Sequence, residues 1–183
     1  FTEFAKIWLT SASLDANYEN ATIDQVNVTV VDNDVAGLWL SARDLNVSEG
    51  TNGSYMVRLT SQPANDGTVI VSVTVDLTEL QASPRSLEFT SSTYNLSQEV
   101  TIHAVDDLVD EGEAAIAIAR HTMSSIQDDF YEGLQGPNVT VLVADNDEAG
   151  VSLVGGWHNV TEGGGPDMYS MALDSRPEET VVI

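Results

Sequence analysis

The sequence predicts an all-β protein made of tandem antiparallel β-sandwiches, and three observations predict it. Apolar and polar residues alternate with a period of two, turn residues separate these short runs, and two motifs return at one fixed distance. Asp32-Asn33-Asp34-Val35-Ala36-Gly37 returns as Asp145-Asn146-Asp147-Glu148-Ala149-Gly150, 113 residues later (145 − 32). Asn46-Val47-Ser48-Glu49-Gly50 returns as Asn159-Val160-Thr161-Glu162-Gly163 at the same distance (159 − 46). Two motifs in one register indicate a tandem repeat.

The repeat length divides the 183-residue chain. We expect 1–34 to be the C-terminal part of a first repeat, 35–147 a complete second repeat, and 148–183 the N-terminal part of a third. The last residues, 179–183, are typical of a strand without its partners, so we expect the chain to be a window on a longer protein. No Gly/Ser linker separates Val141–Ala144 from Val151–Leu153, so consecutive sandwiches are expected to be coupled end to end.

Alternation predicts the strands of the complete repeat. Tyr55, Val57 and Leu59 alternate with more polar residues, and Val69 to Val75 do the same. Further expected strands are Leu38–Leu40 with Leu45–Val47, Ser86–Thr90, Glu99–Val105, Ala114–Arg120 and Val139–Ala144. About seven short strands in roughly a hundred residues favour an immunoglobulin-like sandwich. We expect Trp39, Tyr55, Phe89, Tyr94 and the valines to fill its core. The long connection His121–Pro137 is interpreted as a glycan-bearing or partner-contacting excursion.

The charge of the chain limits its partners. Asp and Glu number 29 against 6 Lys and Arg, a net charge of −23. Such a surface disfavours nucleic acid and anionic lipid and favours cations. No apolar run approaches the roughly 20 residues of a membrane helix, and the absence of cysteine excludes disulfides and thiolate chemistry.

Asparagines indicate the compartment. The N-glycan acceptor pattern Asn-x-Ser/Thr occurs seven times, at Asn20, Asn27, Asn46, Asn52, Asn95, Asn138 and Asn159. We therefore expect an extracellular or cell-surface glycoprotein that passes through the secretory pathway and carries N-linked glycans.

Three acidic clusters fall where strands begin or end. They are Glu49, the run 106–113 and Asp145-Asn146-Asp147. In an up-and-down sandwich, loops separated by an even number of strands share one end, so these clusters can converge at the pole facing the next repeat. Several carboxylates brought together repel one another unless a cation neutralises them. Calcium, which takes six to eight hard oxygen ligands, fits this supply of carboxylates and carbonyls better than magnesium.

These motifs, taken in order, resemble the Calx-beta domain family. The resemblance is carried by 46–50, 100–113 and 141–150 and covers essentially the whole chain. It implies a β-sandwich that binds calcium near the next domain, as in sodium/calcium exchangers and in large cell-surface and adhesion proteins. It also implies the ligands: Glu49, Asp106, Asp107, Asp110, Glu113, Asp145 and Asp147 in the complete repeat, Glu3, Asp32 and Asp34 in the first, and Glu162 in the third. The family's further acidic ligand after the third strand is missing, and Asp76 or Glu79 is a candidate substitute.

The sequence leaves several functions open. The favoured one is a calcium-stiffened rod or spacer in a large adhesion protein, matrix component or surface filament, with neighbouring repeats, other copies or surface proteins as partners. A calcium sensor that regulates a transporter keeps the fold, and an ion-free structural repeat removes the calcium. An enzyme is not expected, because the acids lie in polar turns and no nucleophile or phosphate-loop motif is present. His103 falls within an expected strand, and His121 and His158 are isolated.

Overall fold

The computed structural model describes residues 2–112, 114–155 and 158–183 of an all-β chain. The described residues contain strands and a single 3-10 turn, η1 (Ala64–Asp66), so the predicted all-β class is confirmed. Among them there is no helix long and apolar enough to cross a membrane. The chain divides into two compact units, Phe1–Val35 and Ala36–Ile183.

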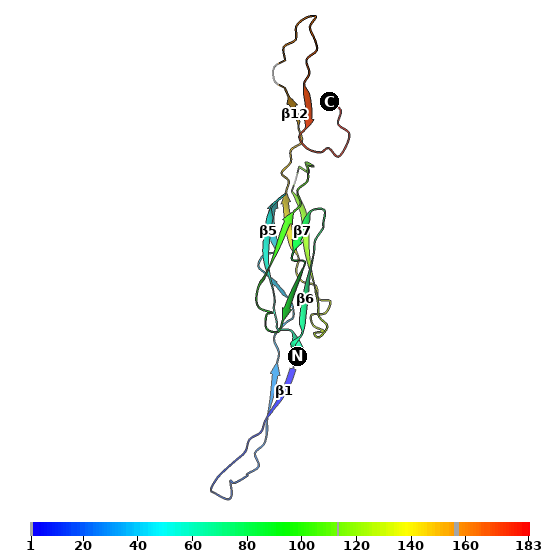
Figure 1. The fold of residues 1–183 in the computed structure, drawn as a ribbon. Coiled ribbons are helices and arrows are strands. Elements are labelled where there is room, and N and C mark those ends of the chain that lie inside the picture. The colour runs from blue at the N-terminus through cyan, green and yellow to red at the C-terminus, as the bar shows by residue number, and fades with distance from the viewer. Residues whose placement is uncertain (1, 113, 156–157) are drawn as a thin grey trace. The chain divides into compact units, whose positions relative to one another are not determined.

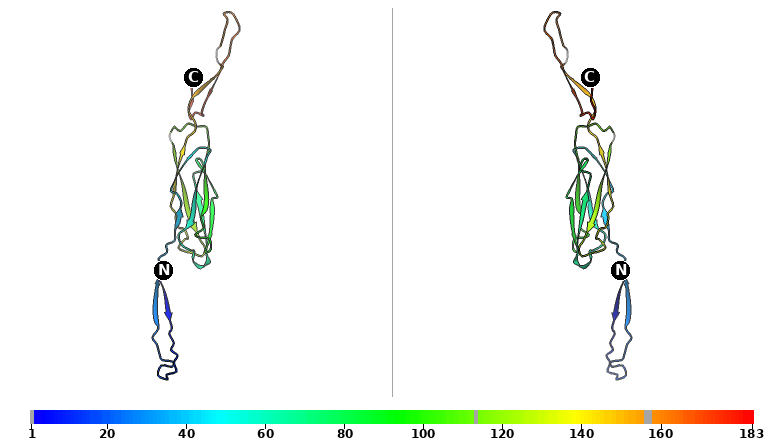
Figure 2. Two further views of the ribbon diagram at one scale, coloured as in Figure 1. Left: turned by 90° about the vertical axis from the view of Figure 1, so that its left-hand side faces the viewer. Right: turned by 90° about the vertical axis from the view of Figure 1, so that its right-hand side faces the viewer.

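The second unit contains a sandwich of two sheets (Figures 1 and 2). The five-stranded sheet has the order β4 (Asp44–Ser48), β11 (Val139–Ala144), β10 (Ala115–Ser124), β6 (Thr68–Thr74) and β8 (Ser86–Thr90). The four-stranded sheet has the order β3 (Leu38–Leu40), β5 (Asn52–Leu59), β9 (Gln98–Ala104) and β7 (Leu80–Ser83).

The core lies between these sheets because each strand buries alternate side chains. Tyr55 and Phe89 are almost fully buried and Tyr94 is half-buried against the core, as predicted. The prediction for Trp39 is wrong, because its side chain is 39% exposed with the Arg58 guanidinium 4.7 Å from its ring centroid. The neighbours of Trp39 in the three-residue strand β3, Leu38 and Leu40, face the core, so the pleat turns Trp39 outward.

One strand pair departs from the antiparallel expectation. β4 runs parallel to β11, with Leu45 opposite Val141 and Ser48 opposite Ala144. The other strand pairs described are antiparallel. Parallel strands end at the same edge of a sheet, so the residues that follow Ser48 and Ala144 emerge side by side.

The segment 121–137 is held against the sandwich by hydrogen bonds. β10 continues to Ser124, and the Tyr131 hydroxyl, buried in the loop that follows, donates to the Ser61 carbonyl at 2.7 Å. The buried Asp128 carboxylate accepts a hydrogen bond from the Ala64 N–H at 2.7 Å. These contacts join the β10–β11 loop to the β5–β6 loop.

His121 is a buried structural residue. Its Nδ1–H donates to the Pro137 carbonyl at 2.7 Å, and its Nε2 lies 2.7 Å from the Tyr55 hydroxyl. Since Nδ1 is the donor, a neutral imidazole accepts from Tyr55 through Nε2. Burial lowers the pKa of His121 and raises the pKa of Tyr55, so both groups are held uncharged.

Two hairpins lie outside the sandwich strands in sequence. The first unit pairs β1 (Thr2–Ile7) with β2 (Val26–Val31), and the second unit also pairs β12 (Val151–Val154) with β13 (Ser170–Leu173). Many apolar side chains of both hairpins are exposed, among them Phe4, Trp8 and Met168.

The loop of the first hairpin has the same pattern of backbone hydrogen bonds as the β10–β11 loop. The N–H groups of Tyr18 and Glu19 bond the Asp15 carbonyl at 2.9 and 3.1 Å, and those of Tyr131 and Glu132 bond the Asp128 carbonyl at 3.2 Å. The two loops are 113 residues apart (128 − 15). The second hairpin matches β3 and β5 in the same way, because Asp174 N–H bonds the Gly150 carbonyl and Thr60 N–H bonds the Gly37 carbonyl, both at 3.0 Å.

Candidate metal centre

Glu49 lies in the tight turn between β4 and β5. Its backbone N–H donates to the Ala144 carbonyl at 3.0 Å, and the Gly50 N–H donates to the Ala104 carbonyl at 3.1 Å. The turn therefore contacts the ends of β11 and β9, which belong to different sheets. Gly50 has a φ of +69°, a left-handed conformation that glycine adopts without strain.

Asp145 and Asp147 follow β11 in a turn that Asp145 itself holds. The Asp147 N–H donates to Asp145 Oδ1 at 2.8 Å, and the Glu111 N–H donates to Asp145 Oδ2 at 2.9 Å. The earlier Asp-Asn-Asp motif forms the same turn, because the Asp34 N–H donates to Asp32 Oδ1 at 3.0 Å. Short acidic side chains favour this conformation because they accept bonds from their own backbone two residues on.

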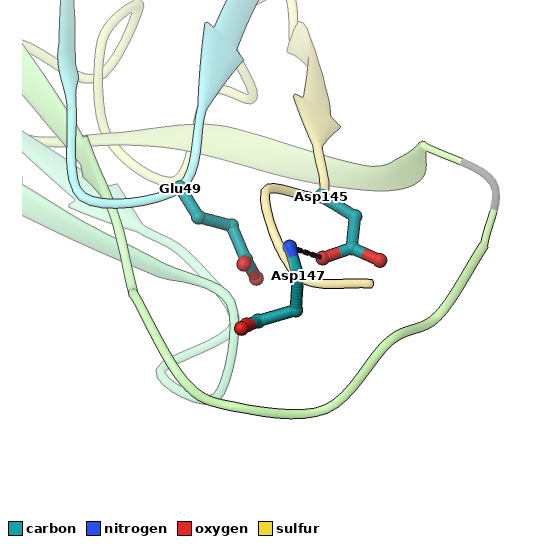
Figure 3. A group of neighbouring side chains, drawn as sticks. All are labelled: Glu49, Asp145 and Asp147. Atoms are coloured by element: carbon teal, nitrogen blue, oxygen red, sulfur yellow. Dashed lines mark hydrogen bonds between the residues drawn. The ribbon is translucent and has the colours of Figure 1, made fainter. Parts of the chain in front are cut away.

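The parallel pairing of β4 with β11 brings the three carboxylates together. One oxygen of each of Glu49, Asp145 and Asp147 lies within 4.8 Å of the others. Figure 3 shows the Glu49 and Asp147 carboxylates pointing toward one another beside Asp145. Glu49 is 7% exposed, and neither its Oε2 nor Asp147 Oδ2 has a hydrogen-bond partner among the described residues. Buried carboxylate oxygens without partners are unfavourable, and no salt bridge to these three carboxylates is found among the described residues.

Mutual repulsion affects the ionisation of the cluster. Burial, followed by the charges of Glu111, Asp145 and Asp107, raises the pKa of Glu49. Burial, followed by the charges of Asp145, Asp106, Asp107 and Asp110, raises the pKa of Asp147. The pKa of Asp145 is instead lowered, chiefly by the hydrogen bond from the Asp147 N–H. The folded chain therefore holds several carboxylates that resist ionising together.

The remaining predicted acids border this centre. The Asp106 Oδ1 accepts from the Asn146 side chain at 2.8 Å, and Asp110 Oδ2 accepts from the Ala149 N–H at 2.6 Å. Asp107 Oδ1 accepts from the Val109 N–H at 2.6 Å. The charges of these carboxylates act on the cluster, but among the described residues the close group of donor oxygens contains Glu49, Asp145 and Asp147 alone.

The predicted ligands in the flanking segments are placed less completely. Glu3 of β1 pairs with Val30 of β2, just as Ala115 of β10 pairs with Val143 of β11. Glu3 is therefore the counterpart of Ala115, and not of an acid in the run before β10. Glu162 precedes Gly163, which has a φ of +74° and so resembles Gly50 after Glu49. Glu113 lies outside the described residues.

The candidate substitutes in the β6–β7 loop differ in their surroundings. Asp76 bonds the N–H and hydroxyl of Thr78 at 3.1 and 2.9 Å, and these bonds lower its pKa. The charge of Glu79 instead contributes to raising the pKa of Glu111, after burial, Asp107 and Asp145.

Sequence reasoning missed two residues of the centre. The Asn146 side chain donates to Asp106 and, at 3.4 Å, to the Glu49 carbonyl, which ties the post-β11 turn to the other two clusters. Glu111 has a raised pKa because of burial and the neighbouring acids. Recurrence of the central asparagine as Asn33 was a signal for Asn146, whereas Glu111 had none beyond its place in an acidic run.

The donor set fits a hard divalent cation. Three carboxylates supply up to six oxygens, and carbonyl groups or water can complete the six to eight ligands of calcium. The unpartnered Glu49 Oε2 and Asp147 Oδ2 are the positions where such a cation would replace missing interactions. All seven predicted glycan acceptors are exposed.

Comparisons with known proteins identify no family. No protein-family model matches the chain, and no curated protein matches its sequence. The crystal structure of the E. coli chaperone DraB is similar at 10% identity and a TM-score of 0.41, over 64% of this chain and 59% of the chaperone. The solution structure of CaCohA2 from Clostridium acetobutylicum is similar at 10% identity and a TM-score of 0.40, over 61% of this chain and 92% of that one.

A third similar structure is a type I cohesin–dockerin complex from Clostridium thermocellum. It has 8% identity and a TM-score of 0.38, over 63% of this chain and 99% of that one. All three likenesses are remote, and no conclusion about the function of this protein follows from them.

Proposed function

We propose that this chain is a segment of an extracellular rod built from tandem Calx-beta-like sandwiches, stiffened by calcium at the joins between repeats. The role is structural or adhesive and not catalytic. The observation that carries the proposal is the buried pair of unpartnered oxygens, Glu49 Oε2 and Asp147 Oδ2, within a group of three carboxylates.

Recurring local geometry supports the tandem arrangement. The first hairpin matches the β10–β11 pair, and the second matches the β3–β5 pair, in strand pairing and in backbone hydrogen bonds. On this reading, the exposed apolar residues of the hairpins are core residues of the neighbouring sandwiches. The same reading accounts for an acidic Asp-Asn-Asp turn at each join.

The acidic pole is formed by Glu49, Asp106, Asp107, Asp110, Asp145 and Asp147. It is hydrogen-bonded to the chain at the join between the second and third repeats, which supports mechanical coupling. The Ala149 N–H donates to Asp110 Oδ2, and the Asp174 N–H bonds the Gly150 carbonyl in the segment that follows. The Asp145 carboxylate accepts hydrogen bonds from the Asp147 N–H in its own turn and from the Glu111 N–H in the loop after β9. A change in charge at Asp145 and Asp147 therefore alters the interactions of the loop after β9 and of the start of the next segment.

The chain's own residues supply the ligands and their orientation. Glu49 comes from the β4–β5 turn, Asp145 and Asp147 from the turn after β11, and Asn146 fixes that turn to Asp106. Bound calcium supplies the positive charge that cancels repulsion among these groups. With repulsion cancelled, the two turns and the loop after β9 can share one rigid arrangement, which restricts the hinge between repeats.

The seven exposed acceptor asparagines and the acidic surface suit a secreted glycoprotein, so we place the protein outside the cell or on its surface. Its partners are then neighbouring repeats and, through its surface, other copies or matrix proteins.

The proposal is tested by comparing Asp147→Asn with Asp44→Asn. Asp44 is an exposed residue at the start of β4, so its substitution changes the net charge equally without touching the group of three carboxylates. We expect calcium affinity, measured by calorimetry, to fall about tenfold or more in Asp147→Asn and to stay near the wild-type value in Asp44→Asn. Equal affinities in all three proteins would remove the acidic pole as the calcium site, and absence of binding would leave an ion-free spacer.

A further inference from the structure

The acidic pole is contacted by a basic residue from the segment after β13. The Arg176 N–H donates to the Leu108 carbonyl at 2.5 Å, and its guanidinium Nη2 lies 3.5 Å from Asp107 Oδ2. Lys and Arg number only 6 in a chain with 29 acids, so a guanidinium at this position alters the local charge balance substantially.

Asp107 transmits this contact to the candidate metal centre. Its negative charge is among the causes that raise the pKa values of Glu49, Glu111 and Asp147. A positive charge held against Asp107 therefore acts on the same carboxylates that would bind a cation.

The equivalent position in the complete repeat carries no charge. Leu173 opposes Val151 at the end of β13, as Leu59 opposes Leu38 at the end of β5, so Arg176 corresponds to Gln62. The Gln62 side chain donates to the Ser91 carbonyl at 3.0 Å within its own sandwich. The arginine is thus a feature of this join and not of the repeat.

We propose that Arg176 is a built-in counter-cation that competes with calcium for the acidic pole. The proposal rests on the calcium function proposed above and concerns the regulation of that site. Without calcium, the guanidinium offsets part of the repulsion around Asp107. Binding of calcium and pairing of Arg176 with Asp107 oppose one another, because both supply positive charge to one cluster. Such coupling is reciprocal, so the affinity for calcium depends on whether Arg176 is paired with Asp107.

The test measures calcium affinity by calorimetry in wild type, Arg176→Gln, Arg176→Lys and Arg120→Gln. Arg120 is exposed on β10 and provides the same change in net charge at a different place. We expect Arg176→Gln to bind calcium about two- to fivefold more tightly, the range for an exposed ion pair. Arg176→Lys keeps the charge and should stay near wild type, as should Arg120→Gln. The gain in Arg176→Gln should shrink at about 1 M salt, where exposed charges are screened.

A second comparison asks whether Arg176 acts through Asp107. In an Asp107→Asn background, adding Arg176→Gln should change calcium affinity by less than half as much as it does in wild type. Unchanged or weaker binding in Arg176→Gln, in a wild-type chain that binds calcium, overturns the competition. A wild-type chain that binds no calcium at millimolar concentration overturns the proposed function itself, and the competition falls with it.

Discussion

Replacement of Tyr131 by phenylalanine tests how the β10–β11 loop is held. Tyr131 is 1% exposed, and its hydroxyl donates to the Ser61 carbonyl at 2.7 Å while accepting from the Ser61 N–H at 3.2 Å. The Ser61 Oγ lies 2.9 Å from the same hydroxyl. Phenylalanine fills the same ring volume, so Tyr131→Phe removes these hydrogen bonds and little else.

The expected cost follows from the burial of Ser61, which is 9% exposed. Water does not readily replace the lost hydroxyl, so the Ser61 N–H and carbonyl are left unpaired, at a cost of about 1 to 3 kcal/mol. A loss of this size lowers the midpoint of thermal unfolding by on the order of 10 °C in a domain of this size.

Urea unfolding of wild type and Tyr131→Phe measures this loss as a shift in midpoint at constant slope. Tyr94→Phe is the matched control, because the Tyr94 hydroxyl has no hydrogen bond among the residues described and the side chain is only half-buried. We expect the control to change the free energy of unfolding by less than about 0.5 kcal/mol. If Tyr131→Phe changed the free energy of unfolding as little as the control does, the Tyr131 hydroxyl would not be what holds the β10–β11 loop.

Three further predictions concern the pole, its ionisation and the core. Gly50→Ala should destabilise the chain by about 1 to 2 kcal/mol in urea unfolding, because a side chain at a φ of +69° is strained; an unchanged midpoint would contradict this. The pKa of Glu49 is raised above 4.5 in the folded chain, so its ionisation opposes folding. Calcium-free stability should therefore fall as pH rises above 4.5, and Glu49→Gln should flatten that fall; an equally steep fall in the variant would exclude Glu49 as a cause. Trp39→Ala should cost less than about 1 kcal/mol and Phe89→Ala about 3 to 5 kcal/mol, since only Phe89 is enclosed; similar losses would contradict the observed burial.

Local alternation predicted most strands because it is the direct signature of a half-buried β-strand. It failed where the pattern is short or carries polar residues. The strand Leu80–Ser83 is not among the strands that alternation predicts, since only Leu80 and Ala82 face the core and several polar residues precede them. Trp39 was expected inside because of its size, yet a three-residue strand flanked by inward leucines left it only the outer face.

The candidate site was predictable as a set of acids but not as a geometry. Spacing alone placed Glu49, Asp145 and Asp147 at strand ends, and the convergence of their oxygens depends on the parallel pairing of β4 with β11. Such pairing is non-local and leaves no mark in either strand. For the same reason, the burial of Glu49 and the contact of Arg176 with Asp107 had no sequence signal.

Calcium titration of the chain by calorimetry, with thermal unfolding followed in calcium and in chelator, tests the central claim most directly. The account predicts saturable binding with a dissociation constant of about 0.1 to 1 mM, typical of extracellular modules, and a higher unfolding midpoint in calcium. No binding heat up to about 10 mM calcium, with the same unfolding midpoint in calcium and in chelator, would contradict it.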